Sequence, residues 1–153
     1  MDRPDQLALV QESFSRLAPM GSALAARFYD VFLGARPDLR ALFPADLSDQ
    51  HRKLAAAISL SVHNLVDPSS LHAALERQAR AHARLRLRDN DLVEFSAALL
   101  GTLAEFEGER WTPELREAWR AALGEIASAY LRALHHVGQG PGGPTQERSS
   151  NRR

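Results

Sequence analysis

The stretch Gln78-Ala-Arg-Ala-His82-Ala-Arg84 decides how the rest of the chain is interpreted, because it ends a helical pattern in a single histidine. The stripe that leads to it recurs at steps of three and four residues, which is the spacing of one helix face. Its members are Leu71, Leu75, Ala79 and His82. Histidine is the commonest metal ligand, but most histidines in helices are surface or core residues that bind nothing. The role of His82 therefore depends on the remaining sequence.

The composition is that of one globular domain. The chain has 153 residues, a formal net charge of zero and no cysteine. A domain of this length buries about 70% of its unfolded surface, so we expect a full hydrophobic core. A neutral molecule has no overall attraction to nucleic acid or to an anionic membrane, and we predict neither as a partner. No apolar run is long enough to span a bilayer and the N-terminus does not resemble a signal peptide, so we expect a soluble, cytoplasmic protein.

Apolar residues at steps of three and four predict helices along most of the chain. The predicted segments are residues 4–17, 21–33, 49–65, 89–106 and 113–136, with a short turn after Pro37 and a further helix that begins near Pro68 and carries His82. Asp2, Ser48 and Thr112 are predicted N-caps, because their side chains accept hydrogen bonds from the first free backbone N–H groups of a helix. No segment has the alternating pattern of a strand, so the predicted fold class is all-α.

The C-terminal segment differs in composition from the rest. It reads GQGPGGPTQERSSNRR over residues 138–153 and is rich in Gly, Pro, Ser and charge. Such a segment cannot bury enough apolar surface to order itself. We therefore predict a folded domain over residues 1–137 and a disordered tail over residues 138–153.

A set of residues spread over the chain completes the pattern that ends at His82. The set is Phe28-Tyr29-Asp30, Pro37, Leu39, Leu42-Phe43, Asp49-Gln50, Leu54, Ile58, His82 and Trp119. In this order and spacing the residues resemble a globin, and more closely the bacterial globins that are similar to the haem domain of flavohaemoglobins. The resemblance covers about residues 7–134. The interval between Phe43 and His82 leaves room for one helix and most of a second to cross opposite faces of a flat cofactor.

The resemblance implies a globin fold, which is a helical sandwich around a haem pocket. It implies that His82 is the proximal ligand of the haem iron and that Phe43 stacks on the porphyrin. A neutral imidazole nitrogen suits iron as a ligand. The chain lacks the cysteines that attach haem covalently, so the expected cofactor is haem b held without covalent bonds.

On the distal side, the resemblance implies that Tyr29 and Gln50 donate hydrogen bonds to bound dioxygen. It implies that Leu54 and Ile58 are apolar residues at the cofactor. Without the resemblance, Tyr29 would be interpreted as a core tyrosine and Gln50 as a solvated residue in a first helical turn. His51 is the alternative distal residue. The apolar stripe favours Gln50, because Leu54 and Ile58 then share its face.

Two arginines and two leucines refine the expected site. Arg84 and Arg86 follow His82 and are candidates to bind the haem propionates. Flavohaemoglobins place a tyrosine and a glutamate behind the proximal histidine, and the matching positions of this chain are Leu92 and Leu134. Without these partners the imidazole is less anionic, which argues against peroxidase-like activity.

The expected function is a haem globin that binds dioxygen reversibly and also takes nitric oxide or carbon monoxide. Two strong distal donors slow dioxygen release, which favours nitric oxide dioxygenation or oxygen storage and sensing over transport. Flavohaemoglobins continue into flavin- and nicotinamide-binding domains, whereas this chain continues into the predicted tail, so we expect a separate reductase as partner and a monomer or weak homodimer.

Two other classes of function remain open. The first is a globin-fold signalling or interaction module without haem, against which Phe43 and His82 both argue. The second is a helical domain that binds protein or nucleic acid through a basic face at helical spacing. That face comprises Arg77, Arg80, Arg84 and Arg88. A charged stripe of this kind is usually the solvated side of an amphipathic helix.

Overall fold

Helices form nearly all of the chain that this computed structural model describes, which is residues 2–82 and 89–138, with side chains for residues 2–80 and 90–135. The elements are α1 (Arg3–Leu17), the 3₁₀ turn η1 (Ala18–Met20), α2 (Gly21–Ala35), α3 (Pro37–Arg40), α4 (Ser48–Asn64), α5 (Pro68–His82), α6 (Asp89–Glu107), the 3₁₀ turn η3 (Gly108–Arg110) and α7 (Pro113–Gly138). Residues 2–82 and 89–138 contain no strand, and the predicted all-α class is confirmed. None of these helices is long and apolar enough to cross a membrane. The predicted tail lies outside the described residues, apart from Gly138 at the end of α7.

Local sequence fixes several helix ends as predicted. Asp2 caps α1 by accepting a hydrogen bond from the Asp5 N–H at 3.1 Å. The Thr112 hydroxyl oxygen caps α7 by accepting from the Leu115 N–H at 3.1 Å. Gly108, after the end of α6, has a φ of 60°. This left-handed conformation is open to glycine at no steric cost, so the chain can turn there from α6 towards α7.

The prediction that Ser48 caps α4 was wrong. Ser48 is the first residue of the helix. Asp46 accepts hydrogen bonds from both the N–H of Ser48, at 3.0 Å, and its hydroxyl, at 2.7 Å. Asp side chains readily accept from the backbone two residues on. The cap position of α4 is Leu47, which makes no side-chain hydrogen bond to the helix.

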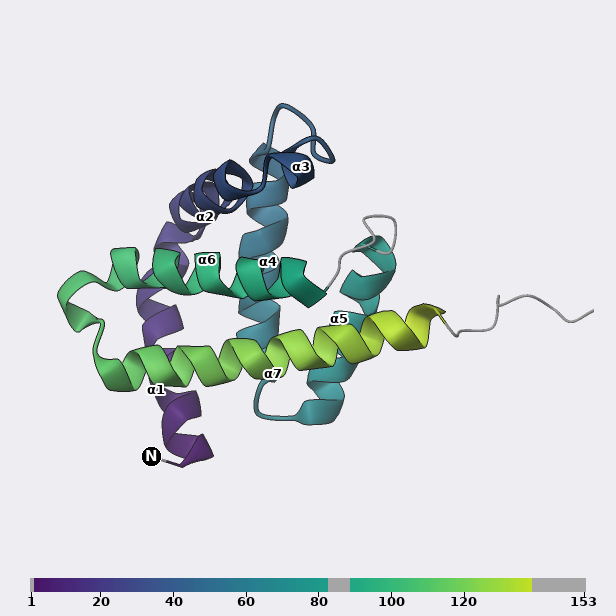
Figure 1. The fold of residues 1–153 in the computed structure, drawn as a ribbon. Coiled ribbons are helices and arrows are strands. Elements are labelled where there is room, and N and C mark those ends of the chain that lie inside the picture. The colour runs from purple at the N-terminus through teal and green to yellow at the C-terminus, as the bar shows by residue number, and fades with distance from the viewer. Residues whose placement is uncertain (1, 83–88, 139–153) are drawn as a thin grey trace, which may run out of the picture.

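Two sets of helices cross one another in the fold. In Figure 1, α6 and α7 run side by side across α1 and α4. α7 packs against α1 and α5, whereas α2 packs against α4 and α6. Phe28 of α2 and Trp119 of α7 are fully buried between these layers. The contacts of α2 with α4 and α6 bring these three helices together around the site described below.

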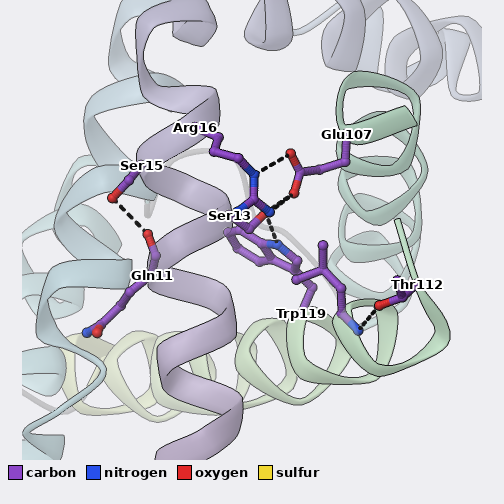
Figure 2. Close-up of polar contacts among 8 residues, drawn as sticks. Gln11, Ser13, Ser15, Arg16, Glu107, Thr112 and Trp119 are labelled. Atoms are coloured by element: carbon purple, nitrogen blue, oxygen red, sulfur yellow. Dashed lines mark hydrogen bonds and ion pairs between the residues drawn. The ribbon is translucent and has the colours of Figure 1, made fainter. Parts of the chain in front are cut away.

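A buried polar network joins α1, α6 and α7 (Figure 2). The indole N–H of Trp119 donates to the Ser13 Oγ at 2.9 Å, and the Ser13 hydroxyl donates to Glu107 Oε2 at 2.9 Å. The Arg16 guanidinium completes the network by pairing with both oxygens of Glu107. Burial alone would raise the pKa of Glu107, but hydrogen bonds from Arg16 and Ser13 lower it below its ordinary value. The network supplies partners to polar groups that would be costly to bury unpaired.

Candidate functional site

A cavity lies where α2, α4 and α6 meet, and α3, the segment after it, α5 and α7 also contribute to its wall. It holds about 900 Å³ of empty space, including the part that opens to solvent. Most of the wall is apolar and consists of Phe32, Leu39, Leu42, Phe43, Leu54, Ala57, Leu92 and Phe95. A mostly apolar cavity with a few polar groups is typical of cofactor and small-molecule sites.

Tyr29 is the main polar group that α2 contributes to this wall. Its side chain is buried, with 7% exposure, and no other described residue hydrogen bonds to its hydroxyl. Burial raises the pKa of Tyr29 to about 12. The phenol therefore stays protonated at neutral pH and can donate a hydrogen bond to a ligand in the cavity.

Rings on several sides hold the phenol of Tyr29. Phe28 makes an edge contact with ring centroids 5.0 Å apart, and Phe43 makes a second edge contact at 6.0 Å. His51 lies beside the ring at 5.7 Å. Phe43 lines the cavity as well. The predicted distal tyrosine and the predicted stacking phenylalanine are therefore in direct contact.

α4 contributes Gln50, Lys53, Leu54 and Ala57 to the cavity. The structure brings the predicted Gln50 and Leu54 together with Tyr29, whereas His51 is absent from the wall. Residues at this spacing share one helix face, which accounts for the grouping. The assignment of Gln50 as the distal residue remains a prediction.

The structure does not bring Ile58 into this group. Ile58 lines a separate cavity between α1, α2, α4 and α6, together with Leu24 and Leu103. The reason is the helical repeat of about 100° per residue. Relative to Gln50, Ala57 is rotated by only about 20°, whereas Ile58 is rotated by about 80°. A sequence stripe drawn through steps of four therefore drifts off the cavity face after Leu54.

The wall also contains side chains to which the sequence analysis assigned no role. Gln78 of α5, Asp91 of α6 and Tyr130 of α7 all line the cavity. Burial raises the pKa of Tyr130 to about 12. Tyr130 follows Trp119 by about three helical turns, so the periodicity of α7 could have indicated its inward position.

The sequence analysis did not predict that Asp91 or Lys53 would line the cavity. Asp91 is buried and pairs with Arg36 at 2.8 Å, which ties the end of α2 to the start of α6. No local pattern signals this long-range pair. Lys53 is three residues after Gln50 and shares its helix face, so its position at the cavity follows from the same spacing that found Leu54.

The predicted iron ligand lies at the boundary of the described chain. α5 ends at His82, four residues after the cavity-lining Gln78. The side chain of His82, and all of Arg84 and Arg86, lie outside the described residues. Their assigned roles therefore remain predictions. Leu92 lines the cavity, and Leu134 packs against the core of the fold.

Comparison with known proteins identifies the family. The family model for globins matches residues 26–130. A flavohemoprotein of Bordetella pertussis is 36% identical in an alignment of 138 residues, which covers 86% of this chain and 34% of that protein. A flavohemoprotein of Deinococcus radiodurans is 30% identical in an alignment of 147 residues, which covers 92% of this chain and 36% of that protein.

This chain thus spans about a third of the length of these relatives. Among solved structures, a bacterial globin from Campylobacter jejuni has a TM-score of 0.81 with 19% identity, over 90% of this chain and 99% of that one. The fold, the matched residues and the sequence identity agree with the predicted resemblance. The chain belongs to the globin family, which implies a haem cofactor.

Proposed function

We propose that this chain holds haem b without covalent bonds, uses His82 as the proximal iron ligand and binds dioxygen reversibly. One observation carries the proposal: a single apolar cavity contains the phenol of Tyr29 and the amide of Gln50 close to the aromatic ring of Phe43. When bound, haem iron supplies the coordination position for a diatomic ligand such as dioxygen, nitric oxide or carbon monoxide.

The residues of the cavity fit this cofactor. The eight apolar residues of the wall exclude water from a flat, largely apolar ring system. α5 reaches His82 one helical turn after Gln78, and positions four residues apart share a helix face. This position in the helix supports His82 as the iron ligand. Lys53 lines the cavity and pairs with Asp49 at 3.2 Å, and we propose it, in addition to Arg84 and Arg86, as a cation for the carboxylates of the cofactor.

The distal side chains determine how a ligand is held. The protonated Tyr29 hydroxyl and the Gln50 side-chain N–H groups would donate hydrogen bonds to a diatomic ligand held in the cavity, and such donors stabilise negative charge that develops on it. Leu54 keeps water away from the same space. Such donors act mainly by slowing dissociation, since association with the cavity does not depend on them.

A slowly released ligand favours reaction over transport. The reaction that we propose combines nitric oxide, dioxygen and one electron to give nitrate, with the electron supplied by a reductase. The similarity to flavohemoproteins supports a flavin-containing reductase as the partner. Oxygen storage or sensing is the second candidate, and it is favoured by the same slow release without requiring a reductase.

The proposal is tested by adding haem to the purified full-length chain and recording the absorption spectrum of the oxidised, reduced and carbon monoxide forms. We expect a sharp Soret band that shifts on reduction and again with carbon monoxide. His82→Ala should lose the ligated spectrum. His63→Ala is the matched control, because His63 is an exposed histidine on α4 away from the cavity wall. An unchanged spectrum in His82→Ala would refute the assigned iron ligand.

A further inference from the structure

His51 has no role in the function proposed above, although it directly follows Gln50. It is absent from the cavity wall. Its imidazole instead lies beside the phenol of Tyr29, with ring centroids 5.7 Å apart and planes inclined by 30°. This distance is within the range of attractive contacts between aromatic rings. His51 therefore touches the residue that is proposed to bind the ligand, without reaching the ligand space.

The three ring contacts of Tyr29 differ in kind. Phe28 and Phe43 meet it with ring planes inclined by 73° and 62°, as edge contacts. His51 is the neighbour whose ring is closest to parallel with the phenol. The hydroxyl oxygen of a tyrosine lies on the axis of the second side-chain torsion, so only the first torsion moves it appreciably. A ring packed towards the face of the phenol opposes that movement, and His51 thereby restricts where the hydroxyl points.

His51 is itself held by the first turn of α4. Its backbone N–H donates to the Leu47 carbonyl at 2.9 Å. Asp46 lies just before this turn, and its pKa is lowered chiefly by hydrogen bonds from Ser48 and, to a smaller extent, by the charge of His51. The imidazole is therefore within electrostatic reach of the Asp46 carboxylate and in contact with the Tyr29 ring. This arrangement links the segment before α4 to the phenol.

We infer that His51 is a positioning residue, which keeps the Tyr29 hydroxyl directed into the cavity where it can donate to a bound diatomic ligand. The expected effect of His51 on ligand binding rests on the proposed function, whereas its expected effect on the orientation of Tyr29 does not. The imidazole of His51 acts through the packing of its ring against the phenol of Tyr29. A substitution that keeps an aromatic ring should therefore preserve its effect, and one that removes the ring should not.

The test compares His51→Ala with His51→Phe in the full-length chain, with His63→Ala as control. The first measurement is the ¹⁹F NMR spectrum after incorporation of fluorotyrosine, with and without haem and carbon monoxide. The chain has two tyrosines, Tyr29 and Tyr130, so Tyr130 provides an internal reference. We expect the Tyr29 signal to shift or broaden in His51→Ala and to stay close to wild type in His51→Phe. The Tyr130 signal should stay in place in all three variants.

The second measurement is functional and uses the ferrous, haem-loaded protein. The infrared stretch of bound carbon monoxide reports hydrogen bonds from distal donors, and His51→Ala should split or shift it. Dioxygen release should accelerate about two- to tenfold, which is the range that corresponds to one aromatic contact. His51→Phe keeps an aromatic ring beside the phenol, so its dioxygen release should stay close to the wild-type rate and clearly slower than that of His51→Ala.

The two measurements distinguish a failure of the positioning role of His51 from a failure of the distal role of Tyr29. If His51→Ala leaves both the Tyr29 fluorine signal and the carbon monoxide stretch as in wild type, the positioning role is overturned. If the fluorine signal changes while Tyr29→Phe has no effect on dioxygen release, His51 does hold Tyr29, but the proposed distal role of Tyr29 fails, and with it the functional part of the inference.

Discussion

Replacing Tyr29 by phenylalanine removes one oxygen atom from the cavity and little else. The ring contacts with Phe28, Phe43 and His51 do not need the hydroxyl. Within the described chain the hydroxyl has no hydrogen-bond partner, so its removal leaves no group unpaired. We therefore expect the free energy of unfolding to stay within about 1 kcal/mol of wild type. An effect on ligand binding can then be attributed to the lost donor.

The size of that effect follows from one hydrogen bond. If the Tyr29 hydroxyl contributes about 1 to 2 kcal/mol to the dioxygen complex, its loss weakens binding by about 5- to 30-fold. Most of this change should appear in the dissociation rate, because the association rate reflects access to the cavity. The rate is measured by mixing the dioxygen complex of the ferrous protein with excess carbon monoxide and following the replacement of one ligand by the other.

Tyr130→Phe is the matched control for this experiment. Tyr130 lines the same cavity with similar burial, but from α7. Because the proposed ligand position lies beside Tyr29 and Gln50, Tyr130→Phe should change dioxygen release far less than Tyr29→Phe. A Tyr29→Phe rate within twofold of wild type, or an equal acceleration in both variants, would refute the assignment of Tyr29 as distal donor.

Three further predictions concern Gln50, the buried network around Ser13, and Tyr130. Gln50→Leu should also speed dioxygen release by several-fold, measured in the same displacement assay, and an unchanged rate would exclude Gln50 as a donor. Ser13→Ala removes the acceptor for the Trp119 indole N–H and a donor to Glu107, so it should lower the free energy of unfolding by about 1 to 3 kcal/mol in urea titrations. A pKa of about 12 for Tyr130 is above the value of about 10 in an unfolded chain, so the folded state binds more protons between these values. The contribution of protonated Tyr130 to the free energy of unfolding is complete below about pH 10 and is lost as the pH rises towards 12. Phenylalanine does not titrate, so the free energy of unfolding of Tyr130→Phe should fall less than that of wild type between pH 9 and pH 11.5. Equal losses in the two proteins would contradict this.

Local patterns accounted for most of the helices and for some of their ends. Asp2 and Thr112 act within three residues along the chain, and both caps were predicted. The cap predicted at Ser48 was wrong, because Ser48 is already the first residue of α4 and the cap position falls on Leu47, without a side-chain hydrogen bond to the helix. The Ser48 N–H and hydroxyl both donate to Asp46, and such a local contact becomes evident only in the folded geometry.

Helical spacing in the sequence indicates which residues of one helix share the cavity face, but it does not indicate packing between helices. Gln50 and Leu54 line the cavity together, as this spacing indicates, whereas Ile58 lines a separate cavity, and the roles assigned to all three remain predictions. Asp91 reaches the cavity wall together with a long-range ion pair to Arg36, and no local pattern encodes such a pair. The globin resemblance, now confirmed by the family match, was carried by the joint pattern of residues far apart in sequence.

The most direct test of the account is a crystal structure of the haem-loaded ferrous protein with carbon monoxide bound, in which the distances from the iron and from the ligand are measured. We predict that an imidazole nitrogen of His82 lies at about 2.0 to 2.1 Å from the iron, the distance typical of imidazole nitrogen bound to a divalent metal. The Tyr29 hydroxyl or the Gln50 amide should lie within hydrogen-bond distance of the carbon monoxide on the other face. A haem outside this cavity, an iron ligand other than His82, or His51 in place of Tyr29 and Gln50 beside the ligand would contradict the account.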